Sequence, residues 1–186
     1  MDGFQGTRGV DGRQPAAAPS QRRAARPPLY TPAERQRRDR SPWTLVQGVL
    51  APVQFIVFVV SLALVLRWWA TGQGYEAATA SVVIKTLTLY TIMVTGCIWE
   101  KVVFDRWLFA PAFFWEDVFS MLVLALHTAY LVALATGALD ARALMGLALA
   151  AYASYVINAT QFILKLRAAR LDEAGRRAAP SEGVAA

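Results

Sequence analysis

The chain has 186 residues, of which 56% are apolar, and it carries a mean hydropathy of +0.36 and a formal charge of +6. This length allows one ordinary domain, and charged residues are missing from windows that would contain several of them in a water-soluble protein. The composition therefore indicates a membrane protein and excludes a soluble nucleic-acid-binding protein, which the positive charge alone would otherwise suggest.

Residues 1–28 are rich in Gly, Pro, Ala and Arg and poor in large apolar side chains, which predicts a disordered basic tail. Residues 29–43 follow as a short amphipathic segment at the membrane surface. In this segment Thr31 is a candidate N-cap, Pro32 takes the first helical position and Glu34 the third. We expect its arginines to face anionic lipid headgroups.

Four apolar windows follow, at 44–66, 75–99, 115–136 and 143–166. Each has about 22 to 25 residues, whereas about 20 are enough to cross a hydrocarbon layer roughly 30 Å thick. The segments between them are short, so successive helices should pack as antiparallel neighbours in a small bundle. The sequence therefore predicts an all-α integral membrane protein with four transmembrane helices in a domain at 44–166. Residues 167–186 are a basic tail whose first turns can extend the fourth helix.

Positive charge is distributed unevenly between the two sides of the predicted bundle. Of the 19 lysine and arginine residues, only Arg67 and Arg142 lie in the segments on one side, and Lys85 lies inside a helix. All the others lie on the opposite side. Because basic segments stay in the cytoplasm, both termini and the middle loop are expected there, as an even number of helices also requires.

Polar side chains inside the helices are the main functional signal, because an ionisable group near the bilayer midplane is costly unless it is paired or lines a cavity. At 100° per residue, Glu116, His127 and Tyr130 share one face of the third helix. The other helices carry polar faces of the same kind. These faces include Gln54 on the first helix, Lys85 on the second, and Asn158 and Gln161 on the fourth. For the uncharged members, hydrogen bonding between helices is the alternative explanation, worth about 0.6 kcal/mol each.

Glu116 and Asp117 begin the third helix, roughly 15 Å from His127 along its axis. They suit two roles: a cap for the helix dipole, or catalysis by at least one of them. The sequence contains no Gly-rich phosphate loop, no metal-spaced histidines and no Ser/His/Asp set, and its single cysteine, Cys97, excludes a multi-cysteine metal site. A small bundle with aromatic walls is then best suited to one flat, apolar ligand.

Four blocks of the sequence resemble a known family: SPWTLVQGVLAPVQF, KTLTLYTIMVTGCIWEK, LFAPAFFWEDVFSMLVLALHTAYL and YVINATQFILKLRAARL. Between about Leu29 and Leu171 the chain is similar to the bacteriochlorophyllide 3-vinyl hydratase family of phototrophic bacteria, known as BchF. The resemblance implies a hydro-lyase that adds water to the C3 vinyl group of chlorophyllide a or a 3-vinyl bacteriochlorophyllide. The product would be the 3-(1-hydroxyethyl) pigment of bacteriochlorophyll a biosynthesis.

The resemblance also implies the surroundings in which the protein works. It implies that no cofactor is needed and that the substrate is a magnesium tetrapyrrole. The expected location is the bacterial inner membrane, cytoplasmic or intracytoplasmic and photosynthetic, in contact with membrane lipid. Other enzymes of bacteriochlorophyll biosynthesis are further candidate partners, and nucleic acid is not.

Such a hydration needs a proton donor, a group that orients or deprotonates water, and a pocket that limits access of water. A carboxyl group in apolar surroundings can stay protonated near neutrality, which suits Glu116 or Asp117 as the general acid. His127 has two candidate roles, as axial ligand to the magnesium of the substrate or as base for the attacking water, and the protein would hold no metal of its own. Lys85 would pair with a propionate or a carboxylate. Ring carbonyls or water would hydrogen-bond with Gln54, Tyr130, Asn158 and Gln161.

Two other functions fit the same residues. A non-catalytic pigment-binding or assembly protein could hold a magnesium tetrapyrrole on one intramembrane histidine. A small transporter could use Lys85 and Glu116. Turnover of the vinyl group separates the enzyme from the pigment-binding protein, and proton-coupled uptake into vesicles would identify the transporter.

Overall fold

The computed structural model describes residues 29–178, which are helical and contain no strand. Their elements are α1 (Pro32–Arg40), α2 (Pro42–Thr71), α3 (Tyr75–Phe104), α4 (Phe114–Thr136) and α5 (Ala141–Ala178). Four helices are long and apolar enough to span a membrane, namely α2, α3, α4 and α5 as far as Leu171. This confirms the predicted fold class. The predicted disordered tail, 1–28, and the end of the C-terminal tail, 179–186, lie outside the described residues.

Most helices extend beyond the apolar windows in the sequence. α2 continues through Arg67 to Thr71 rather than ending in a loop at Leu66, and α5 continues without a break into the predicted basic tail. Hydropathy marks only the part of a helix that lipid can cover, whereas the backbone hydrogen bonds run on until the chain turns away. Glycines with positive φ produce that turn after α2 (Gly72, φ 71°) and after α4 (Gly137, φ 64°).

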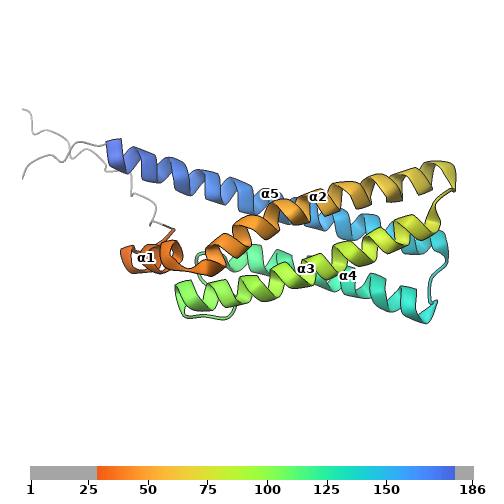
Figure 1. The fold of residues 1–186 in the computed structure, drawn as a ribbon, viewed down its shortest axis with the longest axis horizontal. Coiled ribbons are helices and arrows are strands. Elements are labelled where there is room, and N and C mark those ends of the chain that lie inside the picture. The colour runs from red at the N-terminus through yellow and green to blue at the C-terminus, as the bar shows by residue number, and fades with distance from the viewer. Residues whose placement is uncertain (1–28, 179–186) are drawn as a thin grey trace, which may run out of the picture.

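The four long helices form two helical hairpins. α2 packs along α3 and α4 packs along α5, while the contacts between the two hairpins are fewer. Figure 1 shows α1, the start of α2, the segment 105–113 and the described end of α5 at one end of the bundle, which we call the inner end. The turns after α2 and α4 lie at the opposite, outer end.

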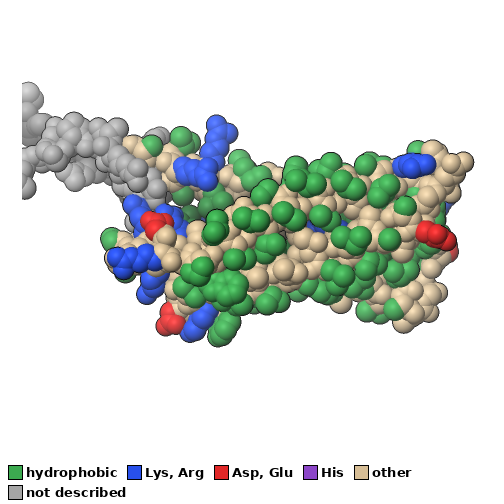
Figure 2. Space-filling view, in the orientation of Figure 1, with side chains coloured by type: hydrophobic (Ala, Val, Ile, Leu, Met, Phe, Trp, Pro, Cys, Tyr) green, Lys and Arg blue, Asp and Glu red, His purple; other side chains and the backbone are tan. Residues whose placement is uncertain are grey.

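Apolar side chains cover the outside of the bundle along its length, while basic side chains gather mainly at the inner end (Figure 2). The exposed apolar residues lie on all four long helices and include Leu45, Ile56, Val60, Ile84, Val94, Leu122, Val132, Ile157 and Ile163. The interior core of buried apolar residues contains Phe58, Val65, Val82, Leu144, Met145 and Ala148. An apolar exterior around an apolar core is the pattern expected of a helical bundle surrounded by lipid.

α1 covers part of the inner end. Its predicted capping box is confirmed: Thr31 Oγ1 accepts the N–H of Glu34 at 3.3 Å, and the Glu34 carboxylate accepts the N–H of Thr31 at 2.8 Å. Arg37 Nε donates to the carbonyl of Val103 at 2.8 Å and so fixes α1 to the end of α3. The preceding Tyr30 is buried among aromatic rings of the same end.

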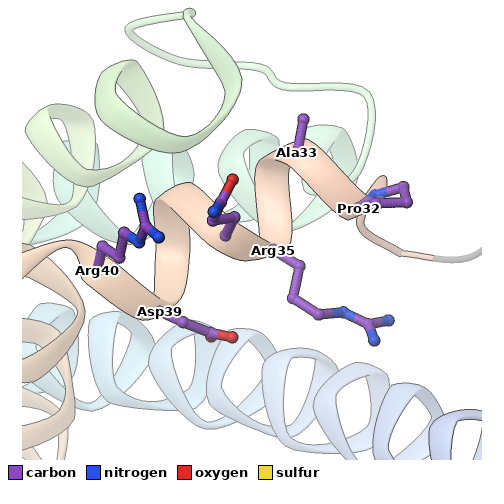
Figure 3. Close-up of a pocket in the computed structure, with 6 residues that line it drawn as sticks. Pro32, Ala33, Arg35, Asp39 and Arg40 are labelled. Atoms are coloured by element: carbon purple, nitrogen blue, oxygen red, sulfur yellow. The ribbon is translucent and has the colours of Figure 1, made fainter.

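An open hollow with a volume of about 590 Å³ runs along α1 (Figure 3). Its lining comes from this helix and consists of Pro32, Ala33, Arg35, Gln36, Asp39 and Arg40. None of the site residues predicted from the sequence is among these six. The functional site therefore has to be sought inside the bundle.

Candidate active site

Some of the polar side chains between the helices, buried or half-buried, tie the helices together. Gln47 Nε2 donates to Thr95 Oγ1 at 2.7 Å and links α2 to α3. Nearer the outer end, the Ser61 hydroxyl bonds with the Ser81 hydroxyl at 2.7 Å and with the Tyr152 hydroxyl at 2.5 Å. These are the interhelical hydrogen bonds that the sequence allowed as the alternative to a functional role.

A second set of buried polar atoms has no such explanation. Within the four described spans, five buried atoms have no hydrogen-bond partner, namely Gln54 Oε1, Lys85 Nζ, His127 Nε2, Asn158 Oδ1 and Gln161 Oε1, while the hydroxyls of Tyr130 and Thr79 face each other. Leaving such a group unpaired costs about 1–3 kcal/mol. All the site residues predicted from the sequence, apart from the two acids and Tyr130, belong to this set. A ligand or water molecules bound inside the bundle would supply the missing hydrogen-bond partners.

His127 is fully buried, and its two ring nitrogens have different surroundings. Nδ1 lies 2.8 Å from the carbonyl oxygen of Val123. Because a carbonyl can only accept, Nδ1 carries the proton and Nε2 keeps a free lone pair. A backbone carbonyl orients metal-ligating histidines in the same way. His127 can therefore ligate a metal ion that a ligand carries, or accept a proton from water.

Lys85 is fully buried on α3, and its Nζ lies 4.0 Å from the ring centroid of Tyr155 on α5. No carboxylate in the described part of the chain bonds to this ammonium group. The acids of the same helix, Glu76 and Glu100, are roughly 13 and 22 Å away along its axis. A lysine at the centre of a membrane helix costs about 2.5–3.5 kcal/mol, of which an aromatic face offsets only about 0.5–2 kcal/mol. The buried cation lacks a counter-ion.

Three buried carboxyl groups lie at the inner end. Glu116 Oε2 accepts a hydrogen bond from Lys165 Nζ at 2.6 Å and so forms an ion pair with α5. Asp117 Oδ2 accepts the backbone N–H of Phe109 at 2.9 Å, and Glu100 Oε2 accepts that of the next residue at 3.4 Å. The last two carboxyl groups thus hold consecutive amides of the segment 105–113.

The side chains of Glu100 and Asp117 also hydrogen-bond to each other. A hydrogen bond between two carboxyl groups requires a proton on one of them. Glu116, in contrast, meets a lysine and needs none. Asp105, just beyond α3, is fully exposed, and the hydrogen bond from Lys101 at 2.6 Å lowers the pKa of Asp105. Of these acids, the Glu100 and Asp117 pair is therefore the one that stores a proton.

Contacts with α5 give the order of the polar groups from the inner end to the middle of the bundle. They are Lys165 with Glu116, Asn158 with Ser120 at 2.9 Å, Tyr155 with Lys85, and Tyr152 with His127. The helical rise spreads this line over roughly 20 Å. It ends at the bonded hydroxyls of Ser61 and Tyr152, and the apolar core continues beyond them.

Comparison with known proteins identifies the chain's relatives. The family of 2-vinyl bacteriochlorophyllide hydratases (BCHF) matches residues 30–168. The chain is 69% identical to the 2-vinyl bacteriochlorophyllide hydratase of Cereibacter sphaeroides over 144 residues, which are 77% of this chain and 89% of the relative. It belongs to this family. The Rhodobacter capsulatus hydratase is 67% identical over 154 residues, or 83% of this chain and 90% of the relative. No solved structure matches the chain.

In this member of the hydratase family, the predicted site residues lie in two groups. The acids face the inner end, and the other residues line the bundle from Gln161 to Gln54. The acids do not reach His127, which lies roughly 15 Å from Asp117 along α4, as the sequence predicted. Glu100 was missed, although it closes α3 where the chain turns back into α4. The sequence offers only an indirect indication of this role: antiparallel packing of α3 and α4 places the end of α3, with Glu100, beside Asp117 at the start of α4.

The ion pair at the inner end can be tested by its contribution to stability. We expect Lys165→Met to lower the free energy of unfolding by about 2 kcal/mol, because it leaves the Glu116 carboxylate buried without a counter-ion. Adding Glu116→Gln should restore most of this loss, since a neutral amide needs no counter-ion. Unfolding in detergent micelles of both single variants and the double variant measures the coupling. Strictly additive losses would contradict the ion pair.

Proposed function

We propose that the chain hydrates a vinyl group on a chlorophyllide or bacteriochlorophyllide, the reaction for which its relatives are named. The name of the relatives calls this substituent the 2-vinyl group, and it is the same substituent as the C3 vinyl group. The observation that carries the proposal is the set of buried polar atoms without partners, which runs from the acidic inner end to His127. A bound pigment and a water molecule would supply hydrogen-bond partners for those atoms, and hydration joins these two molecules.

The proton comes from the pair of Glu100 and Asp117: Glu100 donates it in the hydrogen bond between them, and Asp117 delivers it to the substrate. The O–H bond of Asp117 breaks as the terminal vinyl carbon gains a C–H bond, and the positive charge forms on the carbon beside the macrocycle, whose conjugation spreads it. Water then bonds to that carbon and loses a proton, which returns to the pair of Asp117 and Glu100. No electrons are gained or lost. Glu116 is less suited to donate, because its carboxylate is already bound to Lys165 at 2.6 Å.

Binding of the pigment uses the deeper residues. His127 Nε2 is the axial ligand to the magnesium that the substrate carries, which its free lone pair supports. The amide oxygens of Asn158 and Gln161 lie between His127 and the acids, where they orient water at the vinyl edge. Gln54 and Tyr130 hydrogen-bond to polar groups of the ring.

The hydratase sits in the bacterial inner membrane, cytoplasmic or intracytoplasmic and photosynthetic, with its inner end toward the cytoplasm. The basic residues gathered at that end support this orientation. Lipid surrounds the apolar exterior, and the arginines of α1 face anionic headgroups. Enzymes that precede and follow it in pigment synthesis are its expected partners.

The test is turnover in a host that lacks this pathway. Membranes containing the chain receive chlorophyllide a without any reductant, and membranes from the same host without the chain are the control. We expect a product heavier by one water molecule with a Qy band shifted to the blue. Pigment that binds and stays unchanged would contradict the enzyme and favour the second candidate, a non-catalytic pigment-binding protein.

A further inference from the structure

Lys85 takes no part in the proton transfers proposed above. Among the described residues it is the one lysine or arginine that is fully buried, and its Nζ has no hydrogen-bond partner. The groups that face it are the ring of Tyr155 and, on α4, His127, whose proton is held at Nδ1 by a carbonyl. Neither supplies a negative charge. The bundle therefore contains a buried ammonium group without a counter-ion, and the anion that pairs with it has to come from a ligand.

The anion has to reach the middle of the bundle. The headgroups of lipids stay at the membrane surface, so their phosphates do not reach Lys85. A pigment acid of the chlorophyllide class does, because its propionic side chain is a free carboxylate on the macrocycle itself. In the corresponding chlorophyll this group is an ester and has no charge.

We propose that Lys85 binds the free propionate of the substrate and makes the hydratase selective for the pigment acid over its ester. The inference rests on the proposed function and deepens it. A carboxylate paired with Lys85 enters the apolar interior as half of a neutral pair, so neither charge stays uncompensated. An ester carbonyl offers a weaker, uncharged acceptor. The ester's alcohol would also have to displace the side chains packed beside Lys85, where the rings of Phe58 and Tyr155 lie 4.8 Å apart.

The pairing also orients the ring. Tyr155, which covers Lys85, lies one helical turn from Asn158 on the side away from the acids. With its propionate held there and its magnesium at His127, the pigment keeps its charged group deep in the bundle. Because Lys85 lies between His127 and Asn158 in the order along α5, the propionate sets how the ring is turned about its magnesium on the side of Asn158 and the proton donor.

The test compares kcat/KM for a pigment acid and for its methyl ester in the same membranes. We expect the wild-type hydratase to prefer the acid by about 30-fold or more, and Lys85→Met to reduce this preference to a few-fold by losing activity on the acid alone. Methionine retains an unbranched apolar stem and fills the same space. Thr86→Val is the matched control, because Thr86 is equally buried and bonds only to the backbone carbonyl of Val82.

An acid preference that is unchanged in Lys85→Met would overturn the role of Lys85, while turnover of the acid by both proteins would leave the hydratase activity in place. Absence of turnover by the wild-type protein would refute the proposed function instead. If Lys85→Met binds pigment but does not turn it over, the Kd values of acid and ester, from pigment absorbance, decide the matter. Loss of the acid preference in Kd supports the proposal, and its retention overturns it.

Discussion

Asp117→Asn is expected to lower the rate of hydration by about 10²–10⁴-fold, the range that a general acid contributes. An asparagine cannot give a proton to the vinyl carbon. Its amide oxygen can still accept the N–H of Phe109, so the segment 105–113 should keep its place. The measurement is the single-turnover rate with pigment already bound, together with the Kd of the pigment, which should change little.

The neighbouring acids serve as controls for this prediction. Glu100→Gln should slow hydration by a smaller factor, about tenfold, because the amide still bonds to Asp117 but no longer shares a proton with it. Glu116→Gln should have a smaller effect still, since Glu116 meets Lys165 and not the reacting carbon. A near-normal Asp117→Asn variant beside an inactive Glu116→Gln variant would transfer the role of acid to Glu116.

His127→Ala is expected to weaken pigment affinity by at least tenfold, since even the loss of a residue that supports a metal ligand costs about 10–100-fold. The Kd can be measured from the pigment's absorption bands, which also report axial ligation of the magnesium. Added imidazole should restore part of the affinity, because it fits the space and supplies the missing nitrogen. Thr86→Val is the control, as Thr86 is equally buried, bonds only to the backbone carbonyl of Val82 and leaves the ligand nitrogen in place.

Unchanged affinity in His127→Ala would exclude axial ligation. If hydration were lost at the same time, His127 would be the base for the attacking water, the other role that its free Nε2 allows. If hydration were also unchanged, the deep end of the site would contribute neither binding nor chemistry. The two readouts together therefore separate the candidate roles.

Much of the fold follows from the sequence because lipid imposes a simple rule on composition. The apolar windows predict the four spans, and the 100° step of a helix predicts which residues of α4 face inward: Glu116, Ser120, Val123, His127 and Tyr130 are all buried. The ends of the helices do not follow from that rule. Arg67 is helical although it is charged, because helices continue into the interface until a residue such as Gly72 turns the chain.

The residues of the candidate site are likewise only partly predictable from the sequence. Polar residues that lipid makes costly, such as Lys85 and His127, are recognisable without a structure, and the atoms Lys85 Nζ and His127 Nε2 prove to lack a hydrogen-bond partner. Pairings between helices are not recognisable, because they depend on which ends come together. Glu116 and Asp117 look interchangeable in the sequence, yet the helical step between them directs one to Lys165 and the other to Glu100.

The line of polar groups begins at the acids of the inner end, and the bonded hydroxyls of Ser61 and Tyr152 lie at its deep end beside the apolar core. In the proposed reaction, the proton that Asp117 gives and the proton that water releases are both exchanged at the acids of the inner end. Each turnover is electroneutral across the bilayer. We therefore expect the rate of hydration to be the same in energised and in de-energised membranes.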